Sequence, residues 1–165
     1  MYDKYFLPAD ERRAYEDAVN ATERPVRVGP GAAVGVTEEM IHEVVHGFYA
    51  KVRTDPALAP IFNRVIPDEE WPTHLAKMCD FWSSVLLMTG RFKGTPMVAH
   101  ARIADIRPTH FARWLHLFRQ TAEALCPPPA AALFVARSEM IAQSLQLGIA
   151  MSRGEPPPTG DRLRA

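Results

Sequence analysis

Apolar residues recur at three- and four-residue spacing along most of this chain, which is the pattern of helices that bury one face. The first clear helix is predicted over 37–54. Thr37 is a good N-cap. Asp55-Pro56 ends the segment, because proline disfavours helical dihedrals at the residue before it. Five residues form the apolar face of this helix: Ile41, Val44, Val45, Phe48 and Val52.

A second strong helix is predicted over 68–89. Asp68 and Glu69 suit its N-terminal end, where negative charge is favourable, and Gly90 is a typical C-terminal stop. One broad face of this helix carries six large side chains: His74, Lys77, Met78, Phe81, Trp82 and Val85. Their spacing places them on one side of the helix, where they can line a common surface.

Prolines mark the remaining helices, which we place over 96–104, 108–125 and 130–153, with a short turn or helical bend at 56–63. No segment sustains the period-two alternation of a strand, and no Asn-Gly or Asp-Gly hairpin turn is present. The predicted class is therefore all-α, with about five to seven helices that cross at globin-like angles.

The two ends of the chain differ in character from the segment between them. Residues 1–36 form an N-terminal extension, with a predicted helix over 8–21 and a linker rich in proline and glycine over 24–35. Residues 154–165 are polar and proline-rich, which predicts a disordered tail. The predicted domain covers residues 37–153.

Composition argues against several classes of protein. The 165 residues carry 19 basic and 19 acidic side chains, so no broad charge favours nucleic acid or an anionic membrane. Apolar runs such as 85–88 are far shorter than the roughly 20 residues that span a bilayer. The charged N-terminus does not resemble a signal peptide. Cys79 and Cys126 form no disulfide framework or zinc motif, so we expect a cytoplasmic protein with reduced thiols.

The segment His42-Glu43-Val44-Val45-His46 matches the H-E-x-x-H motif of zinc proteases. On a helix this spacing places two imidazoles on one face, with the glutamate as general base and an open position for water. The motif fixes only three residues, its longer form is absent, and no motif marks a third ligand. A zinc metalloprotease built on these residues is the alternative hypothesis, beside a helix with two solvent-facing histidines.

His74 and His100 form a stronger pair, because each lies among apolar residues on a separate predicted helix. A lone histidine in such surroundings is more often a hydrogen-bonded core residue than a ligand. Met78, Phe81 and Trp82, however, follow His74 at helical spacing and would form a flat apolar wall. Iron held by one imidazole in a dry pocket, with polar groups on the opposite side, describes a haem site.

Other side chains bear on such a site. Lys77, three positions after His74, can extend its ammonium group toward an acidic group at the rim. Tyr49 and Trp114 each carry one hydrogen-bond donor on an apolar body. His110, in the first turn of its predicted helix, is the rival axial ligand.

Six motifs follow one another in unbroken order over about 37–153. They are Phe48-Tyr49-Ala50-Lys51-Val52-Arg53-x-Asp55, Pro60-Ile61-Phe62-Asn63, Trp71-x-x-His74, Phe81-Trp82, Gly94-x-Pro96-x-x-x-His100 and Phe111-x-x-Trp114-Leu115. In order and spacing they resemble the group III truncated haemoglobins. The resemblance implies a two-on-two α-helical sandwich around a non-covalent b-type haem, and it says nothing about the N-terminal extension or the tail.

The resemblance also implies roles for single residues. His100 would be the proximal iron ligand, and Tyr49, His74 and Trp114 would surround bound gas on the distal side. Phe62 would pack on the face of the haem.

Five more residues would complete the cofactor-binding surface. The side chain of Lys77 would pair with a haem propionate. The other four are apolar or aromatic: Met78, Phe81, Trp82 and Phe111.

Dioxygen and nitric oxide are the ligands that the resemblance implies. Dioxygen bound to ferrous iron gains negative charge, so nearby donors favour it and slow its release. Peroxide chemistry would need a distal acid–base group, which His74 could provide. Dioxygenation of nitric oxide would need an electron donor, so an unidentified reductase is a candidate partner.

Overall fold

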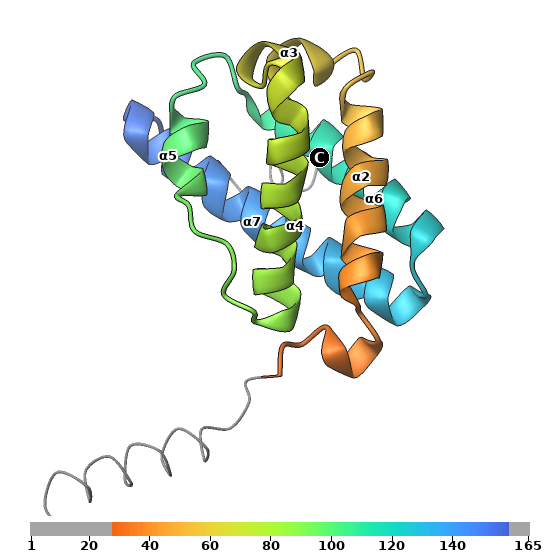
Figure 1. The fold of residues 1–165 in the computed structure, drawn as a ribbon. Coiled ribbons are helices and arrows are strands. Elements are labelled where there is room, and N and C mark those ends of the chain that lie inside the picture. Colours follow the sequence, from red (N-terminus) through yellow and green to blue (C-terminus); the bar gives the residue numbers. More distant parts are fainter. Residues whose placement is uncertain (1–27, 159–165) are drawn as a thin grey trace, which may run out of the picture.

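The computed structural model describes residues 28–158, and every regular element within this range is a helix (Figure 1). Two are short 3-10 turns, η2 (Ala32–Val34) and η3 (Asp68–Glu70). The α-helices are α2 (Glu38–Val52), α3 (Ala59–Val65), α4 (Trp71–Leu87), α5 (Pro96–Ala101), α6 (Pro108–Leu125) and α7 (Pro128–Arg153). The all-α prediction is therefore confirmed. The helix predicted over 8–21 and most of the predicted tail lie outside the described residues. No helix in the described range is long and apolar enough to cross a membrane.

Helix α2 begins where the sequence predicts. The Thr37 hydroxyl accepts a hydrogen bond from the backbone N–H of Met40 at 3.1 Å. Glu38 and Glu39 lie in the first turn, where their charge complements the helix dipole.

Asp55, after the end of α2, is a buried charge that connects three elements. Its carboxylate accepts hydrogen bonds from the backbone N–H groups of Ala57 and Leu58, at 3.0 and 3.1 Å. It also pairs with Arg113 of α6 at 2.7 Å. The hydrogen bond from Arg113 lowers the pKa of Asp55 in spite of its burial, so the carboxylate stays charged at neutral pH. The turn before α3 is thereby fixed to α6.

Helix α4 ends earlier than the predicted stop at Gly90. It ends at Leu87, and Met88 adopts the left-handed conformation, with φ of 57°. The cause is a tertiary contact, because the backbone N–H of Gly31 donates to the carbonyl of Leu86 at 2.8 Å. A Cβ atom on Gly29 would lie 2.3 Å from the same carbonyl oxygen, so the chain before α2 approaches α4 too closely for a side chain there.

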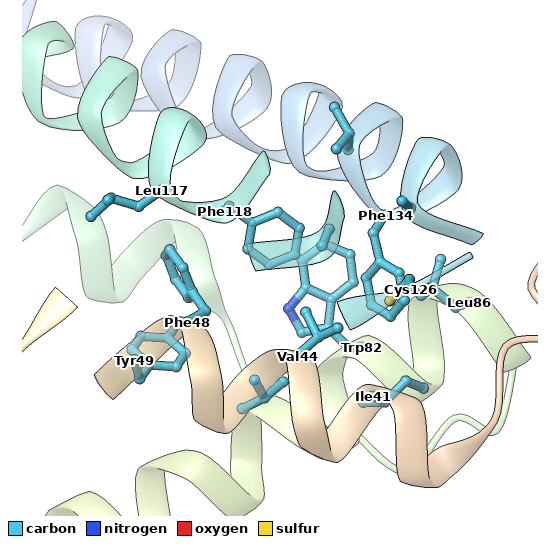
Figure 2. Close-up of a cluster of buried hydrophobic side chains, with 14 of the residues drawn as sticks. Ile41, Val44, Phe48, Tyr49, Trp82, Leu86, Leu117, Phe118, Cys126 and Phe134 are labelled. Atoms are coloured by element: carbon cyan, nitrogen blue, oxygen red, sulfur yellow. The ribbon is translucent and has the colours of Figure 1, made fainter. Parts of the chain in front are cut away.

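The helices form two crossed layers. Helices α2 and α4 lie in front of α6 and α7 in Figure 1, and α2 contacts both α4 and α6. The main core lies between the layers, and Figure 2 shows Trp82 of α4 between Phe118 of α6 and Phe134 of α7. Trp82 and Phe118 are stacked with ring centroids 4.9 Å apart. This two-on-two arrangement is the architecture that the family resemblance implies.

The short helix α5 lies apart from this core and rests on α7. The side chain of Met97 on α5 packs over Gly148 of α7, where a Cβ atom would overlap its sulfur, so the glycine leaves room for this side chain. Arg153, the last residue of α7, donates hydrogen bonds to the carbonyls of Ile103 and Ile106 at 3.0 Å. These contacts hold the connection between α5 and α6 against the end of α7.

Candidate functional site

Tyr49 lies on the buried side of α2, with 6% of its surface exposed. Its ring makes edge contacts with the rings of His74 and Phe62, at centroid distances of 5.3 and 6.1 Å. Burial raises the pKa of the phenol well above its ordinary value. The hydroxyl group therefore stays protonated, and it remains available as a hydrogen-bond donor.

His74 faces Tyr49 from the first turn of α4. Its Nε2 atom is buried and has no hydrogen-bond partner among the described residues. Burial first, and then the charges of Lys77 and His100, lower the pKa of His74 to about 4, so the ring is neutral at neutral pH. A buried polar atom without a partner costs about 1–3 kcal/mol. The Nε2 atom is therefore available to form a hydrogen bond with a small polar ligand.

The hydrogen bonds of two histidines distinguish the predicted iron ligand from its rival. On α5, Nδ1 of His100 lies 2.7 Å from the carbonyl oxygen of Pro96, which can only accept. Nδ1 therefore donates, and Nε2 keeps its lone pair for a metal. At the start of α6, Nδ1 of His110 instead accepts the backbone N–H of Arg107 at 2.9 Å. In the neutral ring Nε2 of His110 must then carry the proton, which blocks it as a ligand.

Trp114 belongs to an aromatic stack on α6. Its ring is parallel to that of Phe118 with centroids 5.2 Å apart, and it meets the edge of Phe48 at the same distance. Phe48 also contacts Tyr49, at 4.9 Å. The predicted distal groups from α2 and α6 thus belong to one continuous set of ring contacts.

The apolar wall predicted on α4 divides into two parts. Met78 and Phe81 are half-buried and pack on the edge of the main core. Trp82 is 3% exposed and stacks on Phe118, which places it behind this surface, inside the core. Phe81 also meets Phe92, in the connection to α5, at 5.2 Å.

Of the remaining predicted cofactor residues, Phe62 and Lys77 lie near Tyr49 and His74, whereas Phe111 belongs to a different apolar cluster. Phe62, from α3, packs against the main core beside Tyr49. Lys77 is exposed, one turn after His74. Phe111 is buried in a second, smaller apolar cluster at the start of α6, and its other buried members are Ile106, Ala142 and Ile149.

Trp71 is a further polar group in this region to which the sequence reasoning gave no role. It is 2% exposed, and its indole nitrogen is buried without a hydrogen-bond partner among the described residues. Its ring lies 5.5 Å from that of His74 and 5.8 Å from that of Tyr49. The guanidinium group of Arg53 lies 4.7 Å above its ring. The three-residue spacing to His74 was the available signal, since it places both rings on one helix face.

The H-E-x-x-H segment lies elsewhere on α2, with His42, Glu43 and His46 all exposed. The two imidazoles are stacked, with centroids 3.9 Å apart. Residues 28–158 contain no group of three or more His, Cys, Asp or Glu side chains placed to hold a metal ion. The three-ligand site of a zinc protease is thus not assembled in this part of the chain.

No family model matches the chain. A curated relative, the group 3 truncated hemoglobin ctb of Campylobacter jejuni, is 34% identical over 113 residues, which are 67% of this chain and 89% of the relative. Among solved structures, the crystal structure of a group III truncated hemoglobin from Campylobacter jejuni matches with a TM-score of 0.64 and 34% identity. That match covers 67% of this chain and 88% of the solved chain.

The crossed helix pairs and this structural match define a protein of the truncated globin class. Within that class, the identity and coverage of the relative are decisive. The chain belongs to the group III truncated haemoglobins.

Proposed function

We propose that this chain binds one b-type haem without a covalent bond, with Nε2 of His100 on the iron, and binds dioxygen or nitric oxide on the opposite face. The observation that carries the proposal is the hydrogen-bonding state of two imidazoles. Nδ1 of His100 is committed to the Pro96 carbonyl, which leaves its Nε2 free. Nε2 of His74 is buried without a partner in the described structure. The residues present therefore fit the haem that the family implies.

The distal residues have different roles in binding a gas molecule. Haem supplies an iron position at which a diatomic gas can bind. The protonated phenol of Tyr49 would donate a hydrogen bond to the bound gas, and the indole of Trp114 would be a second donor. His74, neutral at neutral pH, either donates or moves aside and thereby controls access. We add the indole N–H of Trp71 to this set, because it is buried beside His74 and lacks a partner in the described structure.

The surrounding residues keep the site dry and orient the cofactor. Phe62, Met78, Phe81 and Phe111 supply apolar surface that excludes water, with Trp82 behind it. Excluding water strengthens the hydrogen bonds from the distal donors. Lys77 is exposed, and its ammonium group would pair with a haem propionate at the rim.

Two kinds of chemistry are compatible with this set of residues. A neutral His74 can accept a proton, as peroxide chemistry requires. Dioxygenation of nitric oxide uses the same donors but needs electrons from elsewhere, for which an unidentified reductase is the proposed partner. Several donors around one small ligand favour slow release, which suits tight binding or redox chemistry better than delivery of oxygen.

An absorption titration with haemin tests the proposal. The full chain should develop a Soret band at one haemin per chain, and His100→Ala should abolish or strongly weaken it. Added imidazole should restore the band in His100→Gly, because a free ligand can fill the space left by the side chain.

Two variants serve as matched controls for this experiment. The Soret band should persist in His110→Ala, which removes the rival histidine, and in His42→Ala, which removes the zinc-motif histidine. A band that survives in His100→Gly without imidazole, or disappears in His110→Ala, would overturn the assignment of the iron ligand.

A further inference from the structure

Two histidines on α2 have no part in the proposed haem site. His42 and His46 lie one helical turn apart and are exposed, while the opposite side of α2 is buried in the core. Their rings are stacked, with centroids 3.9 Å apart and planes 22° from parallel. Neither ring forms a side-chain hydrogen bond within residues 28–158, and both residues are exposed, so the pair is accessible to a ligand from solvent.

The spacing of these rings suits the chelation of one metal ion. Zinc and copper bond to imidazole nitrogen at about 2.0–2.1 Å, so two nitrogens on one ion lie about 3 Å apart. The two rings, one helical turn apart with centroids 3.9 Å from each other, are close enough to turn one nitrogen each toward a shared ion. Helix α2 is also a rigid support, since Thr37 caps it and Ile41, Val44 and Val45 anchor it in the core. Little ordering entropy is then lost on binding.

The neighbouring charges favour a cation at this position. Glu39 and Glu43 lie within three residues of His42 and are exposed.

We propose that His42 and His46 together form a surface site for one divalent transition-metal ion, with water in the remaining positions. Copper(II) should bind most tightly, because it leads the order of affinities for nitrogen ligands and accepts two adjacent nitrogens in a square-planar arrangement. The site is not the catalytic zinc site of a protease, since the described structure supplies no third protein ligand. It is independent of the haem proposal, because neither histidine contributes to that site.

The proposal is tested by titrating the full-length protein, as purified, with copper(II) chloride. Electron paramagnetic resonance should show one copper(II) per chain, with an axial spectrum split by two nitrogen ligands. By calorimetry, His42→Ala and His46→Ala should each weaken binding about a hundredfold, because the second ligand acts at a high effective concentration. Zinc(II) should compete with copper(II) for the same site.

The matched control is His116→Ala, which removes a single exposed histidine from α6. Copper affinity and the two-nitrogen spectrum should be unchanged in this variant. Equal binding by wild type, His42→Ala and His46→Ala would show adventitious binding elsewhere and overturn the proposal, as would a spectrum with one nitrogen ligand. Both histidines are exposed, so circular dichroism should confirm that these variants keep the fold.

Discussion

On the distal side of the proposed haem site, Tyr49 and Trp114 are fixed by aromatic neighbours that belong to the main core. On the proximal side, His100 stands on α5, a helix of six residues of which none is buried. The core packing that stabilises the fold therefore also holds the distal groups in position. The proximal histidine depends on a few specific contacts.

Two sets of those proximal contacts are polar hydrogen bonds. The Pro96 carbonyl orients the ring of His100, and Arg153 holds the connection that follows α5 through the carbonyls of Ile103 and Ile106. The comparison implies that retention of haem and release of gas respond to different substitutions. The predictions below test this separation in order of decreasing effect.

The largest expected effect is on the distal side. Tyr49→Phe removes one hydroxyl and keeps the ring contacts with Phe48 and His74. Dioxygen dissociation should become about 10- to 150-fold faster, because a hydrogen bond to a charged partner contributes about 1.5–3 kcal/mol. Stopped-flow displacement of dioxygen by carbon monoxide measures this rate. Trp114→Phe should act in the same direction.

The matching readout for Tyr49→Phe is the transfer of haem to a haem-free acceptor globin. Its rate should stay close to that of wild type. If Tyr49→Phe loses haem faster but releases dioxygen at the wild-type rate, the role proposed for Tyr49 on the distal side is wrong.

On the proximal side, Arg153→Ala should release haem about tenfold faster, because hydrogen bonds from a charged donor contribute about 1.5 kcal/mol or more. The loss of these bonds frees the connection between α5 and α6, and with it the position of His100. Transfer to an acceptor globin measures the change. Arg137→Ala, which removes an arginine from the middle of the same helix, is the control. If both variants lose haem equally fast, the anchoring role of Arg153 is wrong.

A smaller effect is expected for Trp71. Trp71→Phe removes the buried indole N–H but keeps an aromatic ring beside Tyr49 and His74. Dioxygen dissociation should become about two- to tenfold faster, because a neutral hydrogen bond contributes about 0.5–1.5 kcal/mol. The infrared stretching frequency of bound carbon monoxide should also shift, since it reports on nearby donors. An unchanged frequency would remove Trp71 from the distal set.

Helix boundaries could be predicted from sequence where local signals decide them. Pro108 and the Cys126-Pro127 step bound α6, and the predicted range 108–125 is the observed one. The end of α4 could not be predicted in this way, because it depends on the contact between Gly31 and Leu86, which are 55 positions apart in the chain (86 − 31). The end that Gly90 predicts therefore lies later in the chain than the observed end at Leu87.

The candidate site shows a similar limit. Residue type and spacing single out His74 and His100, because both lie in apolar surroundings on separate helices. Spacing alone does not separate His100 from His110, since that choice depends on which ring nitrogen donates and which accepts. The unpartnered indole of Trp71 is likewise visible only once burial and hydrogen bonds are known.

A pH dependence of stability tests how closed the distal side is. The pKa of His74 is about 4 in the folded chain, against about 6.5 in the unfolded chain. Between these values the unfolded chain binds more protons, so the free energy of unfolding should fall as the pH is lowered from 6.5 toward 4. Urea unfolding at several pH values measures the slope, which should be shallower in His74→Leu by up to about one proton. Above pH 7, His74 is neutral in both states, and the two proteins should show parallel pH dependence. If the slopes are equal below pH 6.5, His74 is already open to water in the folded protein, and the distal side is no more closed than the proximal one.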